Sequence, residues 1–131
     1  MLDDAGSFAG GAAKEIEEET GLTVSQDELL DLTALAFEQD PQSTNGEELN
    51  KAVYPSPGGC DEFIPIMLYQ KRIPRGQLKD WQGKLTGLRD AGEKITLKVV
   101  PLQKLWREGG RDGKTLAAWA LYEGLRKEGK L

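Results

Sequence analysis

The sequence predicts an α/β fold, and three observations support that class. An amphipathic helix is expected near the start of the chain, a longer one is expected at its end, and strand-like segments lie between them. The length of 131 residues suffices for one domain with a hydrophobic core. From this order of elements we expect an α/β/α sandwich, in which helices cover a mixed sheet, within a single domain over residues 1–131.

The first helix is expected at residues 8–20. Gly21 follows it at the position where helices commonly end on a left-handed glycine, and the apolar Leu22 comes next. Ser25 and Glu28 then have the spacing of a capping box, which predicts a short turn or helix.

Strands are expected in the middle of the chain, at residues 32–37, 62–73 and 94–100. The second segment is continuously apolar, which is typical of a central strand covered on both faces, although Pro65 suggests a bulge. The third segment alternates polar and apolar residues, as a half-buried strand does. The polar segment at residues 38–52 contains proline and glycine and predicts a long loop.

Helices are expected again in the second half of the chain. Two short ones are predicted at residues 77–83 and 102–107, and a long terminal helix is predicted at residues 112–127. Trp106 and Trp119 lie in the last two of these helices. Their helical context favours packing in the core over stacking on a nucleotide base.

The composition excludes several classes of function. A net charge of −5 argues against nucleic acid and anionic membranes as partners. No apolar run approaches the ~18 residues of a membrane span, and no secretory signal is apparent, so a cytoplasmic location is expected. With Cys60 as the only cysteine and no histidine, disulfides, cysteine zinc clusters and histidine dyads are excluded. Acid–base chemistry must therefore come from carboxylates, lysines, tyrosines or metal-bound water.

Carboxylates crowd the first expected helix. Glu15, Glu18 and Glu19 stand at i, i+3 and i+4, so they share one helical face. Like charges at this spacing repel one another. Either a solvated acidic face or a site for a hard cation such as Mg²⁺ would explain the cluster.

Residues 14–22, Lys-Glu-Ile-Glu-Glu-Glu-Thr-Gly-Leu, resemble the second half of the Nudix box, the signature of the Nudix hydrolases. The departure is Lys14, which replaces the usual arginine and cannot form the same two-pronged bond to a carboxylate. The first half of the box does not match, because Gly6 stands at the family's first glutamate and the available acids are Asp3 and Asp4. We therefore expect an amino-terminally truncated, partial Nudix domain that lacks the first strands of its sheet.

Two further stretches resemble the branch of this family that hydrolyses ADP-sugars. Ser56, Pro57, Gly58 and Gly59 match a stretch that shapes the substrate pocket, and an ordinary turn into a strand is the alternative. Glu93 takes the place of a loop glutamate that this branch presents to the catalytic water. The alternative for Glu93 is a surface residue at the start of a strand.

The resemblance implies metal-dependent hydrolysis of an ADP-sugar (ADP-ribose or ADP-glucose) to AMP and a sugar phosphate. Glu15 and Glu19 would hold Mg²⁺ or Mn²⁺, Glu18 would complete the metal site or assist catalysis, and Glu93 would orient or deprotonate the attacking water. The full-length form is expected to be a homodimer. The alternative is a non-catalytic Nudix-like domain that binds a nucleotide or a partner protein, or an inactive fragment.

Overall fold

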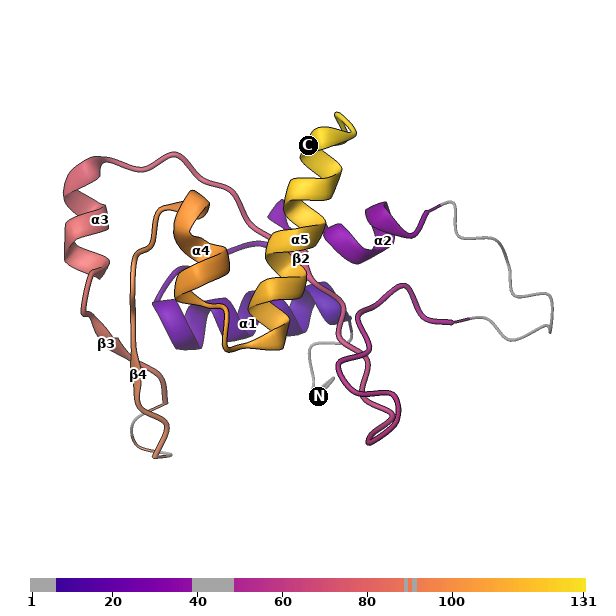
Figure 1. The fold of residues 1–131 in the computed structure, drawn as a ribbon. Coiled ribbons are helices and arrows are strands. Elements are labelled where there is room, and N and C mark those ends of the chain that lie inside the picture. Colours follow the sequence, from indigo (N-terminus) through magenta and orange to yellow (C-terminus); the bar gives the residue numbers. More distant parts are fainter. Residues whose placement is uncertain (1–6, 39–48, 89, 91) are drawn as a thin grey trace. The chain divides into compact units, whose positions relative to one another are not determined.

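The structure is a computed structural model that describes residues 7–38, 49–88, 90 and 92–131 (Figure 1). The segments before residue 7 and at residues 39–48, including Asp3, Asp4 and Gly6, lie outside the described residues. The chain divides into two compact units. The first unit comprises the chain up to Leu30 together with Tyr69–Pro101, and the second comprises Asp31–Leu68 and Leu102–Leu131. The single domain over residues 1–131 stays a prediction.

The first unit begins with α1 (Phe8–Thr20), which has the predicted bounds. Ser7 caps its start, because the Ser7 hydroxyl oxygen accepts a backbone N–H from the first turn at 3.0 Å. Gly21 ends the helix in the left-handed conformation, with a φ of 74°. The helix packs against the short 3₁₀ helix η1 (Gln26–Glu28), which begins with the predicted capping box.

The first unit also contains α3 (Arg75–Trp81) and a hairpin of β3 (Leu85–Thr86) and β4 (Ile95–Thr96). The two strands are antiparallel, with Leu85 opposite Thr96, and β3 lies against α1. The strand predicted at residues 94–100 is thus confirmed, but it is shorter than expected. Within the described part of the chain, β4 pairs with β3 alone, which is itself two residues long.

The second unit contains α2 (Leu32–Ala36), where the sequence predicts a strand, so that prediction is wrong. Asp31 is the physical reason. Its carboxylate accepts hydrogen bonds from the N–H of Ala34 at 2.8 Å and from the hydroxyl of Thr33 at 2.6 Å, which caps the helix. A short apolar run has no period that distinguishes a strand from a buried helix, and the alanines favour the helix.

The long central strand that the sequence predicts is reduced to β2 (Met67–Leu68), which forms a two-stranded sheet with β1 (Leu30–Asp31). An isolated antiparallel bridge joins Val53 to Ile64. Pro65 separates that bridge from β2, because proline has no N–H to donate to a strand ladder. The described residues therefore form helices with two small sheets. This content fits an α/β class, and the sandwich stays a prediction.

The second unit ends with α4 (Leu102–Glu108) and α5 (Gly113–Lys127), both close to their predicted bounds. The long helix α5 packs against α2 and α4. Leu32 on α2 and Leu125 on α5 are almost fully buried, at 2% and 3% exposed, and form part of the core of this unit. None of the described helices has the length and apolar character needed to cross a bilayer.

Candidate active site

The acidic cluster lies on α1 as predicted. Glu15 and Glu19 are exposed, while the Glu18 side chain is about three-quarters buried, at 25% exposed. Lys14 Nζ lies 3.9 Å from Glu18 Oε1, one helical turn away. This ion pair is long and its lysine is exposed, so it contributes little to stability, although it partly balances the charge of Glu18.

The β3–β4 hairpin brings Glu93 to the carboxyl-terminal end of α1. The backbone N–H of Gly87 donates to the carbonyl oxygen of Glu18 at 3.3 Å, so the hairpin loop is joined to the helix. Within the loop, Leu88 N–H donates to Glu93 Oε2 at 3.1 Å, and Glu93 N–H donates to the Leu88 carbonyl oxygen at 3.1 Å. The Glu93 side chain is therefore fixed by the same short segment that touches α1.

Glu19 feels the charges of two other predicted site residues, Glu15 on the same helix and Glu93 on the hairpin. The pKa of Glu19 is raised, first by burial, then by repulsion from Glu15, and then by repulsion from Glu93. Glu19 is nevertheless an exposed residue by its accessible surface, so its desolvation is partial and solvent screens these effects. The fold thus brings together carboxylates from α1 and from a hairpin that is distant in sequence.

The chemistry of these side chains fits a hard divalent cation. Carboxylate oxygens are the ligands that Mg²⁺ prefers, and a cation among mutually repelling carboxylates would replace the repulsion by attraction. Among the described residues, however, no three side chains of the metal-binding types are close enough together to surround an ion. The donors fit the cation, and the assignment of Glu15, Glu18 and Glu19 as its ligands stays a prediction.

The predicted substrate stretch forms a tight turn. The N–H groups of Gly59 and Cys60 both donate to the carbonyl oxygen of Ser56, at 2.8 and 2.9 Å, and the turn from Ser56 through Pro57, Gly58 and Gly59 is exposed. This turn belongs to the second unit, whereas the four glutamates belong to the first. A contribution of the turn to the same pocket stays a prediction.

Sequence reasoning misses two residues of the hairpin, Gly87 and Thr86. Gly87 has a φ of 87°, a conformation that favours glycine, and a glycine directly after a short strand is the signal that could have drawn attention to it. The hydroxyl oxygen of Thr86 is buried and has no hydrogen-bond partner among the described residues. Nothing in the sequence predicts that burial.

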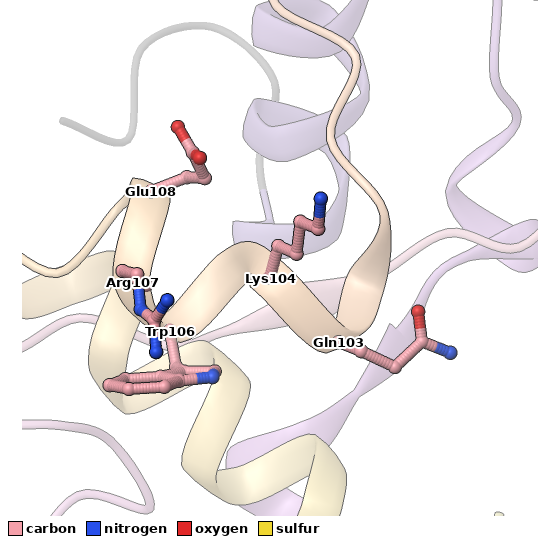
Figure 2. Close-up of a pocket in the computed structure, with 5 residues that line it drawn as sticks. All are labelled: Gln103, Lys104, Trp106, Arg107 and Glu108. Carbon is pink, nitrogen blue, oxygen red and sulfur yellow. The ribbon is translucent and has the colours of Figure 1, made fainter.

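A surface cavity of about 220 Å³ lies on α4 in the second unit (Figure 2). Trp106 is 44% exposed, so the prediction that it packs in the core is wrong. The Arg107 guanidinium lies over its ring, 4.8 Å from the centroid, in a cation–π contact. Trp106 is exposed together with Gln103 and Arg107, and the half-buried Leu105 lies on another side of α4. The cavity is lined by Gln103, Lys104, Trp106, Arg107 and Glu108.

Comparison with known proteins agrees with the motif on α1. The chain is 39% identical over 127 residues to the Arabidopsis thaliana protein named "Nudix hydrolase 14, chloroplastic". The match supports the Nudix hydrolase family. It covers 97% of this chain but 38% of the relative, so the chain spans well under half the length of that Nudix hydrolase. No family model and no solved structure matches the chain. The relative's name places that protein in the chloroplast, so a cytoplasmic location for this chain stays a prediction.

Proposed function

We propose that this chain is part of a metal-dependent Nudix hydrolase that cleaves the diphosphate bond of a nucleoside diphosphate derivative, and that its substrate is an ADP-sugar. One observation carries the proposal: the hairpin loop that holds Glu93 is joined to the acidic helix α1 by a hydrogen bond from the N–H of Gly87 to the carbonyl oxygen of Glu18, at 3.3 Å. The similarity to a curated Nudix hydrolase supports the reaction class, which is hydrolysis of a phosphoric anhydride. ADP-sugar specificity rests on the resemblance of residues 56–59 and of the Glu93 loop.

Each glutamate has a distinct role in this proposal. Glu15 and Glu19, one helical turn apart on α1, would hold Mg²⁺ or Mn²⁺, with Glu18 beside them. When bound, the cation supplies charge neutralisation at the diphosphate. The crowding that raises the pKa of Glu19 supports this role, because a site built for a cation gathers negative charge.

Glu93 orients the attacking water and accepts its proton. Its Oε2 already accepts the Leu88 N–H at 3.1 Å, which fixes the direction of the carboxylate. An ionised carboxylate has about four lone-pair sites, so Glu93 retains the capacity to bind a water molecule as well. Attack of that water on one phosphorus yields AMP and a sugar phosphate without a covalent enzyme intermediate.

A second candidate function is nucleotide binding without turnover. Two observations favour it: the described residues contain no compact group of three metal-binding side chains, and the Glu93 carboxylate is engaged by its own loop. In this case the chain would bind a nucleotide without hydrolysing it, and Glu93 would only brace the hairpin.

The deciding experiment measures AMP release from ADP-ribose and from ADP-glucose in the presence of Mg²⁺. We expect turnover by the wild-type chain and a loss of at least ~10²-fold in Glu19→Gln, since a catalytic cation contributes several kcal/mol. Glu17→Gln is the matched control, because Glu17 lies on the same helix but its Oε1 accepts the hydroxyl of Thr23 at 3.2 Å. We expect the control to stay within about threefold of wild type.

The two candidate functions predict different results. A wild-type chain that is folded by circular dichroism and binds ADP-ribose in calorimetry, but releases no AMP, supports the nucleotide-binding function. Equal activity in Glu19→Gln and wild type contradicts the metal role of α1.

A further inference from the structure

We infer that Gly87 is a positioning residue for Glu93, and that it acts by joining the Glu93 loop to the carboxyl end of α1. Gly87 has no side chain to offer a substrate, so its contribution is made through its backbone. The inference rests on the proposed function, in which Glu93 orients and deprotonates the attacking water. It adds the backbone contact that positions Glu93 relative to the acidic helix.

The end of α1 supplies the anchor for this contact. The last four carbonyl groups of an α-helix have no N–H partner within the helix, and Glu18 carries one of them, because α1 ends at Thr20. The neighbouring carbonyl of Glu17 accepts the N–H of Gly21 at 2.8 Å. Gly87 N–H reaches the Glu18 carbonyl from the hairpin, at 3.3 Å. This hydrogen bond thus satisfies one carbonyl group at the helix end and joins the loop to the helix that carries the acidic cluster.

The close approach of two backbone segments explains why this residue is glycine. A Cβ atom at Gly87 would lie 3.0 Å from the Glu93 carbonyl oxygen and 3.3 Å from Glu93 Cγ. The first distance is tighter than nine in ten ordinary Cβ contacts, and this backbone oxygen can give way only if the loop moves. The φ of 87° adds a second penalty for any other residue. A side chain here would therefore displace Glu93 itself.

Hydrogen bonds inside the loop make the position of the Glu93 carboxylate depend on the position of Gly87. Leu88, the next residue, donates its N–H to Glu93 Oε2 and accepts the Glu93 N–H, each at 3.1 Å. Hydrogen bonds thus hold both the backbone and the carboxylate of Glu93 in place relative to residues 87–88. A shift at Gly87 changes where the carboxylate lies relative to Glu19.

Gly92 provides a matched control in the same loop. Its φ is 88°, almost that of Gly87, but a Cβ at Gly92 would meet no atom of the described residues within 4 Å, its own chain neighbours aside. Alanine at either position incurs the same type of conformational penalty, and only alanine at Gly87 also presses on Glu93. The comparison separates positioning from a general effect on folding.

The test compares kcat and KM for AMP release from ADP-ribose with Mg²⁺ in five chains: wild type, Gly87→Ala, Gly92→Ala, Glu93→Gln and the double variant of Gly87→Ala with Glu93→Gln. We expect Gly87→Ala to lower kcat at least ~10-fold, because small misplacements of a catalytic group are costly, and to leave KM within about twofold. We expect Gly92→Ala to stay within about threefold of wild type. Once Glu93 is replaced, Gly87→Ala should lower kcat by less than about twofold more, because both changes act on one carboxylate.

Several outcomes overturn the inference. Equal losses in Gly87→Ala and Gly92→Ala would reduce Gly87 to a conformational role, and additive losses with Glu93→Gln would mean that Gly87 acts elsewhere. Circular dichroism confirms folding of each variant. If Gly87→Ala does not fold, Gly87→Asn takes its place, because asparagine tolerates positive φ but still adds a Cβ.

Amide hydrogen exchange distinguishes failure of the proposed function from failure of this inference. If wild type releases no AMP, the proposed function fails, but the positioning can still be read from exchange of the Leu88 amide measured by NMR. Slower exchange in wild type and Gly92→Ala than in Gly87→Ala and Glu93→Gln supports it. The same exchange rate in all four chains overturns it.

Discussion

Glu93 raises the pKa of Glu19, although one residue lies at the β3–β4 hairpin and the other near the end of α1. Burial of Glu19 acts more strongly in the same direction, and Glu15 adds to it. A carboxyl group whose pKa is higher in the folded than in the unfolded chain destabilises the folded state once it ionises. The fold therefore holds these carboxylates together against their mutual repulsion, as the proposed cation site requires.

The first prediction concerns the stability of Glu19→Gln. We expect a melting temperature about 1–3 °C above that of wild type at pH 7, because the substitution removes a charge that burial and its neighbours disfavour. The wild-type chain loses this stability as the pH rises from the pKa of Glu19 in the unfolded chain through its higher pKa in the folded chain. Below the ordinary value of 4.5, the carboxyl is protonated in both states, so the two chains should melt alike. Thermal melts at several pH values measure this, and a lower melting temperature at pH 7 would contradict it.

The second prediction contrasts two glycines of the acidic helix. Gly11 lies inside α1 with open space around a Cβ, so Gly11→Ala should stabilise the chain by about 0.5–1 kcal/mol. Gly21 ends the helix at a φ of 74°, so Gly21→Ala should destabilise it by about 1–2 kcal/mol. Urea denaturation gives both values. Stabilisation by both substitutions would mean that the left-handed end of the helix is not formed in solution.

The third prediction concerns the core of the second unit. Leu32 is 2% exposed, so Leu32→Ala should lower the free energy of unfolding by about 2–5 kcal/mol. Leu49 is 76% exposed in the same unit, and Leu49→Ala should change that free energy by less than about 0.5 kcal/mol. Similar effects at the two leucines, measured by urea denaturation, would show that α2 does not pack as described.

The fourth prediction concerns the start of α5. Asp112 caps this helix by accepting the N–H groups of Lys114 and Thr115, each at 3.2 Å, and the Thr115 hydroxyl at 2.7 Å. The bond from the Thr115 hydroxyl is the main cause that lowers the pKa of Asp112 below its ordinary value of 3.8. Asp112→Ala should lower the melting temperature by a few degrees, roughly 3 °C, at pH 7.

The effect of Asp112→Ala should depend on pH. A lowered folded pKa contributes stability above the unfolded pKa, and this contribution is lost as pH falls through the folded pKa. The gap between the melting temperatures of wild type and Asp112→Ala should therefore narrow below about pH 3.8. A gap that is constant down to pH 2 would indicate that the carboxylate does not cap α5.

Helices were accessible from the sequence because their signals are local. Gly21 marks the end of α1 both in the sequence and in the structure, and α5 begins within one residue of its predicted start. The strands depend on partners that are distant in sequence, so their lengths could not be predicted. The helix at residues 32–36 was mistaken for a strand because its cap, Asp31, is a single residue beside a short apolar run.

The site was predictable to a similar extent. The spacing of Glu15, Glu18 and Glu19 places them together on any helix, so local geometry suffices for this half of the site. The approach of Glu93 to that helix requires the hairpin to fold back, which residue spacing does not indicate and the family resemblance does. A positioning role for Gly87 could not be predicted, because it depends on a contact with α1 that forms only in the folded chain.

Each unit is built from two segments, and the segments of the two units alternate along the sequence, which has a consequence for synthesis on the ribosome. The first unit needs Tyr69–Pro101 as well as α1, and the second needs Leu102–Leu131 as well as Asp31–Leu68. Neither can be completed until most of the chain has emerged, several seconds after α1 at typical rates of translation. A helix the length of α1 is marginal in water by itself, so the nascent acidic helix should acquire its stable form only when the hairpin arrives.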